Sequence, residues 1–236
     1  MPADLSAERF IERLRALGSP FARENVERQF RTGAEDDFFN VRMRDVFDLA
    51  KEFVDLPPGE IDKLLDSQVH EVRVGAVSIM GKQFLKRQTT EARKKELFEL
   101  YLKRTDRIND WDLVDVSAHQ VIGGYLLDKP RDVLYELARS EHWWERRIAV
   151  FATLTLIRKG DLDDLFRLAE LLVNDEYDLV QKVVGGMLRE AGKHDRARLL
   201  AYLDRYAAVA PRLLLSDAME HLDKDQRAHY RSLKAK

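Results

Sequence analysis

The sequence predicts an all-α protein in which short helices stack in pairs. Glycine (11 residues) and proline (6 residues) are scarce in a chain of 236 residues, as is typical of mostly helical proteins. Apolar residues recur at helical spacing in one segment after another. No segment alternates convincingly between apolar and polar residues, so we expect no β-sheet.

Most of the expected helices are bounded by a recognisable break in the sequence. Gly18 ends the first helix, and Pro58 can open a helix because the missing N–H of proline is harmless in the first turn. Pro130 closes a long helix, while Gly160 and Gly192 end two later ones. The expected helices are 6–17, 21–31, 43–54, 58–66, 69–87, 90–104, 110–128, 130–140, 143–158, 161–174, 177–191, 194–208, 211–222 and 224–235, with residues 32–42 irregular.

Composition indicates a globular protein with one core. The chain is 45% apolar and 35% charged, which is enough to form a single domain spanning residues 1–236. The absence of cysteine excludes disulfides and thiolate metal sites. The N-terminus shows no signal peptide and no stretch is long enough to span a membrane, so we expect a cytoplasmic protein with no membrane partner. A formal net charge of −2 argues mildly against nucleic-acid binding.

A degenerate repeat is visible in the charged residues that interrupt or border apolar runs. Arg73, Asp115, Arg147, Lys182 and Asp217 are separated by 42, 32, 35 and 35 residues. This spacing is close to that of the helix pairs in HEAT-like solenoids, which are α-α superhelices with a concave inner surface. The repeat therefore places the five residues in a column on neighbouring inner helices. The alternative interpretation is a structural ladder of ion pairs between repeats.

Positive charge gathers in one stretch in spite of the negative total. Between Lys82 and Arg107 there are nine lysines and arginines but four acids, a local excess of five positive charges. The stretch could contact a polyanion, but a solvated helix surface is the more common explanation of such a run.

Two short segments hold all three tryptophans together with charged residues. Trp111 and Asp115 are one helical turn apart, and Trp144 precedes Arg147 in the run Trp143-Trp144-Glu145-Arg146-Arg147. Aromatic faces and a carboxylate can stabilise a developing cation such as the sugar in glycosidic bond cleavage, and an arginine can hold a phosphate. These residues predict chemistry at a sugar–phosphate backbone, although a tryptophan buried beside a structural ion pair would give the same pattern.

Metal chemistry is not indicated. No His-Glu-x-x-His motif is present among the scattered histidines. Asp110, Asp112 and Asp115 superficially suggest a calcium loop, but the loop glycine and terminal glutamate are missing. We therefore expect no metal and no other cofactor.

The motifs together resemble those of the AlkD-type DNA alkylation repair glycosylases, from about Phe21 to Glu220. The strongest match is Asn109-Asp110-Trp111-Asp112-Leu113-Val114-Asp115, and the second is Trp144-Glu145-Arg146-Arg147. Further matches, in the expected order, are Phe30-Arg31-Thr32-Gly33, Val41-Arg42 with Leu49-Ala50-Lys51, Leu188-Arg189-Glu190 and Pro211-Arg212.

The resemblance implies a HEAT-like repeat protein that holds duplex DNA on a concave face and excises positively charged alkylated purines. These would be N3-methyladenine, N7-methylguanine or bulkier N3 and N7 adducts. By resemblance, Trp111 contacts the deoxyribose, Asp115 stabilises the cationic sugar and positions water, and Arg147 holds the backbone near the lesion. Such a protein would work as a monomer without cofactor, associated with the nucleoid while it acts on DNA. Its expected DNA-binding residues are Trp144, Arg146, Lys182, Arg189, Arg212 and Arg73.

The sequence also departs from the family pattern. Gly186 stands where a second cleft tryptophan is expected, and Ser216-Asp217 replaces an Arg-Tyr pair. A Gly-Val turn reads Asn40-Val41. Two alternatives therefore stay open: a non-catalytic module that binds bent or branched DNA, and a HEAT-type protein-interaction scaffold.

Overall fold

A computed structural model describes residues 5–19 and 36–233, and these residues are all-α, as predicted. They contain no strand, only an isolated bridge between Asp37 and Val69. The expected helix 21–31 and the first part of the irregular stretch lie outside the described residues. The chain divides into two compact units, residues 1–125 and 126–236.

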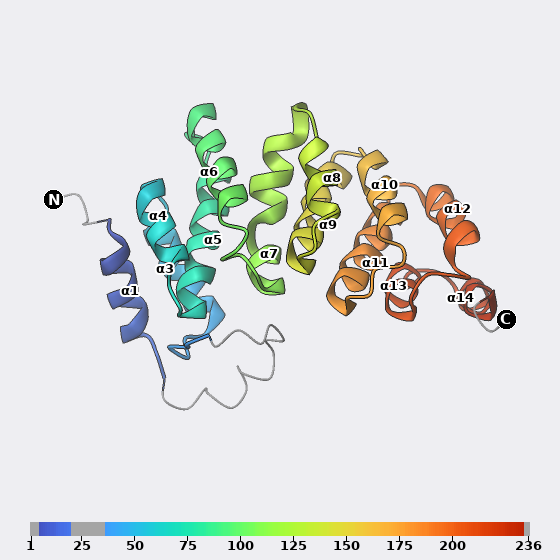
Figure 1. Cartoon of the computed structure of the whole chain (residues 1–236), viewed down its shortest axis with the longest axis horizontal. Helices are drawn as coiled ribbons and strands as arrows, with labels where there is room; N and C mark the ends of the chain where they lie inside the picture. The colour runs from blue at the N-terminus through green and yellow to red at the C-terminus, as the bar shows by residue number, and fades with distance from the viewer. Residues whose placement is uncertain (1–4, 20–35, 234–236) are drawn as a thin grey trace. The chain divides into compact units, whose positions relative to one another are not determined.

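The first unit is organised around one buried helix, α5, which packs against the helices on either side of it (Figure 1). Fourteen of its sixteen residues are buried, as expected for a helix that other elements surround. The helices of this unit are α1 (Ala7–Ala16), α3 (Met43–Glu52), α4 (Pro58–Leu65), α5 (His70–Leu85), α6 (Glu91–Lys103) and α7 (Trp111–Ala118).

The predicted helix 110–128 is helical from residue 111 to 128, but it is not α-helical over its whole length. It changes after α7 into a π-helical turn, η1 (His119–Gly123), and residues 126–128 form a 3-10 turn, η2 (Leu126–Asp128). A Cβ on Gly81 would collide with the side chain of Gln120, and one on Gly124 would lie 2.6 Å from the ring of Phe84. The backbones of α5 and of the η1 region thus approach closely in the part of the chain that contains the π turn.

The second unit forms two layers of helices. α9, α11 and α13 pack in sequence in one layer, while α8, α10 and α12 pack against them (Figure 1). Gly160 ends α9 with a φ of 81°, a conformation that glycine adopts readily. The helices are α8 (Asp132–Ala138), α9 (Trp143–Ile157), α10 (Asp163–Leu171), α11 (Asp178–Gly192), α12 (Arg196–Tyr206), α13 (Arg212–Ala218) and α14 (Lys224–Ser232).

The charged repeat positions fall on packed neighbours within each unit. Arg73 and Asp115 lie on α5 and α7, which pack together, and Arg147, Lys182 and Asp217 lie on α9, α11 and α13. Helix pairing at the predicted spacing is therefore present in both units. No described helix combines the length and apolar character needed to cross a membrane.

Candidate functional site

The first half of the candidate site is the half-buried side of α7. Asp110 caps this helix, and its Oδ1 accepts from the N–H of Trp111 at 2.6 Å. Leu113, Val114, Ser117 and Ala118 are buried, so this stripe anchors α7 in the core. Trp111 and Asp115 lie one turn apart off that stripe and are both half-buried. The predicted pairing of the tryptophan with the carboxylate is thus possible on the accessible part of the helix.

Tyr101 of α6 supplies the buried neighbour of this pair. Burial raises the pKa of Tyr101, and the negative charge of nearby Asp115 raises it further. The tyrosine therefore stays protonated and uncharged near Asp115.

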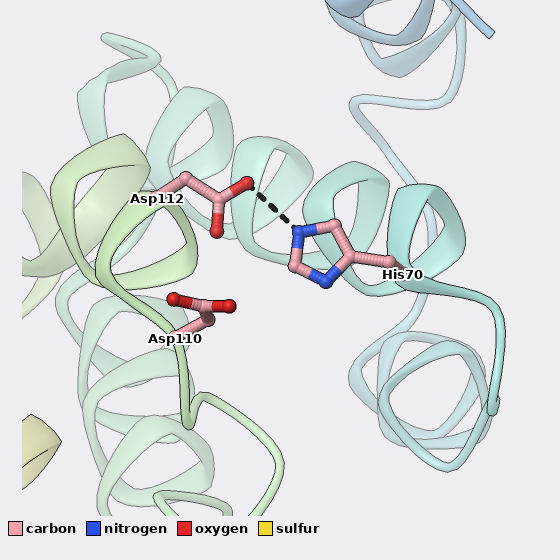
Figure 2. A group of neighbouring side chains, drawn as sticks. All are labelled: His70, Asp110 and Asp112. Atoms are coloured by element: carbon pink, nitrogen blue, oxygen red, sulfur yellow. Dashed lines mark hydrogen bonds and ion pairs between the residues drawn. The ribbon is translucent and has the colours of Figure 1, made fainter. Parts of the chain in front are cut away.

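Next to Trp111, the start of α7 meets a buried histidine that the sequence analysis did not single out. His70, the first residue of α5, is 0% exposed. Its Nε2 lies 2.8 Å from Oδ2 of Asp112, and its Nδ1 lies 3.1 Å from Oδ2 of Asp36. Figure 2 shows the His70 ring facing Asp112, with the carboxylate of Asp110 beside them. The repeat could have revealed this contact, because His70 and Asp112 are separated by 42 residues, as are Arg73 and Asp115.

The pKa values of His70, Asp110 and Asp36 are all shifted from their ordinary values. Burial alone would lower the pKa of His70, but hydrogen bonds to Asp112 and Asp36 outweigh it and raise the pKa to about 9. Burial, followed by the charge of Asp112, raises the pKa of Asp110 to about 6. Burial would also raise the pKa of Asp36, but hydrogen bonds from His70 and Arg73 lower it.

The same cluster contains the donor types of a metal site. His70, Asp110 and Asp112 each offer one ligand atom, and these atoms lie within 4.8 Å of one another. The Nε2 of His70 is, however, at direct hydrogen-bonding distance from Asp112. The arrangement fits a proton between these two atoms better than an ion.

The second half of the predicted site lies on α9, in the other unit. Trp144 is half-buried and stacks on His142, with ring centroids 4.6 Å apart. Arg147 is 7% exposed and donates from Nη1 to the backbone oxygen of Leu179 at 2.6 Å. The predicted set is thus divided, with Trp111 and Asp115 on α7 and Trp144 and Arg147 on α9. The bond to Leu179 ties α9 to the first turn of α11.

Two of the arginines expected to bind DNA have structural partners. Arg73 is 1% exposed, and both its terminal nitrogens donate to Asp36, at 3.0 and 2.6 Å. Arg146 forms a two-pronged pair with Asp175, at 2.6 and 3.1 Å, and also donates to backbone oxygens. We therefore interpret Arg73 and Arg146 as structural ion pairs, the alternative that the sequence left open.

The other expected DNA-binding cations are more accessible. Lys182 of α11 and Arg212 of α13 are exposed on helices that pack together. Arg189 is half-buried and pairs with Glu220 and Glu190. Lys182 and Arg212 are consequently the residues of this set best placed to meet a phosphate.

Most of the lysines and arginines in the basic stretch 82–107 pair with acids of the same unit. Within α6, three lysines and arginines pair with glutamates one turn away. Arg104 pairs with Asp62 and Asp66, and Lys86 pairs with Asp55. This pattern favours the interpretation of the stretch as a solvated helix surface.

The structure explains some of the positions at which the sequence departs from the family pattern, but not all of them. Asn40 has a φ of 59°, so it takes the left-handed conformation that the expected glycine would adopt. A Cβ on Gly185 would collide with the backbone oxygen of Leu214, whereas one on Gly186 would meet nothing within 4 Å. Close helix packing therefore explains Gly185 but not Gly186. Burial raises the pKa of Asp217, and the nearby charges of Arg189 and Lys182 oppose this shift.

A comparison with known protein families decides the wider class. The family model described as DNA alkylation repair enzyme matches residues 10–222, which is most of the chain. The chain belongs to the DNA alkylation repair enzymes. The predicted family is thereby confirmed, and it implies DNA as the substrate of this DNA alkylation repair enzyme. None of the curated proteins compared with the chain matches it.

Proposed function

We propose that this DNA alkylation repair enzyme is a monofunctional DNA glycosylase for cationic N3- and N7-alkylated purines in duplex DNA. The observation that carries the proposal is the Trp111–Asp115 pair, which lies one turn apart on the accessible side of α7. A carboxylate kept beside an aromatic side chain, off the core, suits the stabilisation of a cationic sugar.

The proposed reaction breaks the bond between C1′ of the deoxyribose and the purine nitrogen. The bonding electrons leave with the purine, whose positive charge they neutralise, and C1′ becomes oxocarbenium-like. Water then adds to C1′ and loses one proton. Asp115 stabilises the positive C1′ and orients the water, while the ring of Trp111 contacts the sugar. Because the alkylated base is already a cationic leaving group, the site need not protonate it or flip it into a pocket.

The residues of the second unit would act on the DNA backbone. Lys182 and Arg212, both exposed, would contact phosphates and contribute to salt-dependent affinity. Arg147, held by its bond to Leu179, would contact the DNA backbone. Trp144 would contribute an aromatic surface at the start of α9.

The test is release of free bases from duplex DNA treated with a methylating agent, followed by chromatography. We expect N3-methyladenine and N7-methylguanine in the supernatant and abasic sites, without strand breaks, in the DNA. Tight binding to this DNA with no base release at high enzyme concentration would instead identify a DNA-binding module. Weak DNA binding that hardly depends on salt would favour a protein-interaction scaffold.

A further inference from the structure

His70 joins three segments that are distant in the sequence. Its backbone N–H donates to the oxygen of Asp37 at 2.9 Å, and its ring reaches Asp36 on one side and Asp112 on the other. The neighbouring Glu71 is 1% exposed and accepts from the backbone N–H groups of Phe39 and Val41. The start of α5 thus fixes both the segment before α3 and the start of α7.

Both ring nitrogens of His70 face carboxylate oxygens. An ionised carboxylate only accepts hydrogen bonds, and a neutral imidazole can donate from only one nitrogen. Asp36 is kept ionised by Arg73, and Asp112 accepts from the N–H of Leu113 with its other oxygen at 2.8 Å. A doubly protonated His70 satisfies both contacts, and it offsets the negative charge that the two aspartates bring into the core.

The other charged groups around the ring come from known elements. Asp110 and Asp112 face it from the start of α7, Asp36 from the segment before α3, and Arg73 from α5 itself. Arg107, in the loop before α7, acts electrostatically on Asp36 and Arg73. Charged groups of α3 lie instead near Lys82, at the far end of α5.

The first turn of α7 depends on these carboxylates. Asp110 accepts from the N–H of Trp111, and Asp112 accepts from that of Leu113, which satisfies donors that a helix start leaves open. Trp111 lies between the two aspartates, and Asp115 follows one turn later. Whatever fixes Asp112 therefore fixes the backbone that carries Trp111.

We propose that His70 is a positioning residue of the excision site: by donating to Asp36 and Asp112, it clamps the first turn of α7 and so places Trp111 and Asp115. The proposal rests on the function proposed above for its catalytic consequence. Its structural consequence, a change at Trp111 when His70 changes, can be tested without any catalysis.

The experiment compares the parent with His70→Gln, whose two donors share one amide nitrogen and so cannot replace the two separate ring nitrogens that face the carboxylates. His194→Gln is the matched control, because His194 is an exposed histidine of the second unit. All three tryptophans are labelled with 5-fluorotryptophan, and the resonance of Trp111 is assigned with Trp111→Phe. We expect His70→Gln to move the Trp111 resonance and leave those of Trp143 and Trp144 unchanged.

Excision is measured on the same proteins under single-turnover conditions. We expect His70→Gln to lower the rate constant by about tenfold or more, as a small misplacement of reacting groups can do. DNA affinity should stay within about twofold, since the change acts on positioning rather than on ground-state binding. An unmoved Trp111 resonance, or equal movement of all three resonances, overturns the clamp. A parent without excision refutes the proposed glycosylase, while the resonances still decide the clamp.

A pH titration of the parent provides a second test if His70→Gln does not fold. The Trp111 resonance should shift with a midpoint near pH 9, and the midpoint should fall in Asp112→Asn, which removes one negative charge beside His70. The absence of a shift in the parent between pH 7.5 and 10 contradicts the clamp. A resonance that moves on addition of EDTA and returns with Zn²⁺ would also overturn it, in favour of a metal ion held by the same residues.

Discussion

Two adjacent glycines of α11 should respond to alanine with opposite signs. A Cβ on Gly185 would collide with the backbone oxygen of Leu214 and lie 2.9 Å from Cβ of Asp217, so α11 and α13 would have to separate. Overpacking of this kind costs about 1–3 kcal/mol, and backbone atoms cannot rotate away. Gly186 faces open space, so Gly186→Ala should stabilise the helix by about 1 kcal/mol through helix propensity alone.

The assay is thermal unfolding followed by far-UV circular dichroism, with urea unfolding as a check. For a chain of this size, each kcal/mol corresponds to a shift in Tm of about 2–4 °C. We expect Gly185→Ala to lower Tm by several degrees, because the clash exceeds the gain in propensity, and Gly186→Ala to raise it. Destabilisation by both substitutions would show that position 186 is also tightly packed and would refute the assignment of Gly186 to an open surface.

The free space beside Gly186 also leads to a prediction about activity. Gly186→Trp has room at its Cβ and restores the aromatic side chain expected at this position. Stacking on a nucleotide is worth about 1–3 kcal/mol, or roughly 5- to 150-fold in rate or affinity. Single-turnover rates should rise on methylated purines and fall on bulky N3 or N7 adducts. Equal changes on both substrates would contradict a role of Gly186 in substrate range.

Four further changes distinguish structural from DNA-contacting charges. Asp110→Asn keeps the helix cap but removes a buried carboxyl whose pKa is raised from 3.8 to about 6. Because a raised carboxyl pKa opposes folding above pH 6, we expect this variant to be more stable than the parent in urea at pH 7.5, by roughly 3 kcal/mol, but not at pH 4. Arg146→Ala strands the buried Asp175 and should cost on the order of 3 kcal/mol in urea unfolding, without changing the salt dependence of DNA binding. Lys182→Ala should do the reverse, leaving Tm unchanged and reducing the salt slope by about one, and an unchanged slope would exclude a phosphate contact. Arg147→Ala should lower both Tm and the salt slope, and an effect on Tm alone would restrict Arg147 to its bond with Leu179.

Helix positions could be predicted because their signals are local. Proline at the first position of α4 and glycine with positive φ after α9 each act within a few residues, and both helices have nearly the predicted ends. The π turn after α7 could not be predicted in this way. It lies where the η1 region approaches α5 at Gly81 and Gly124, and the residues in contact there are about 40 positions apart in the sequence.

The candidate site was predictable where its residues share one helix. Trp111 and Asp115 are related by one turn, so their common accessible side follows from the periodicity of α7. The acid partners of Arg73 and Arg146 were not predictable, because Asp36 and Asp175 are brought to them by tertiary packing. His70 and Asp112 are 42 residues apart, as in the repeat. Their hydrogen bond also depends on how α5 packs against α7, which the spacing alone does not predict.

In the proposed reaction, the carboxylate of Asp115 carries out the excision chemistry. The most direct measurement is the single-turnover release of N7-methylguanine from duplex DNA by the parent, Asp115→Asn and Glu99→Gln. The last variant removes the same charge from an exposed position on α6 of the same unit. We predict that Asp115→Asn releases no base above background while it retains parental circular dichroism and DNA affinity, and that Glu99→Gln behaves like the parent. Release by folded Asp115→Asn at the parental rate would contradict the account.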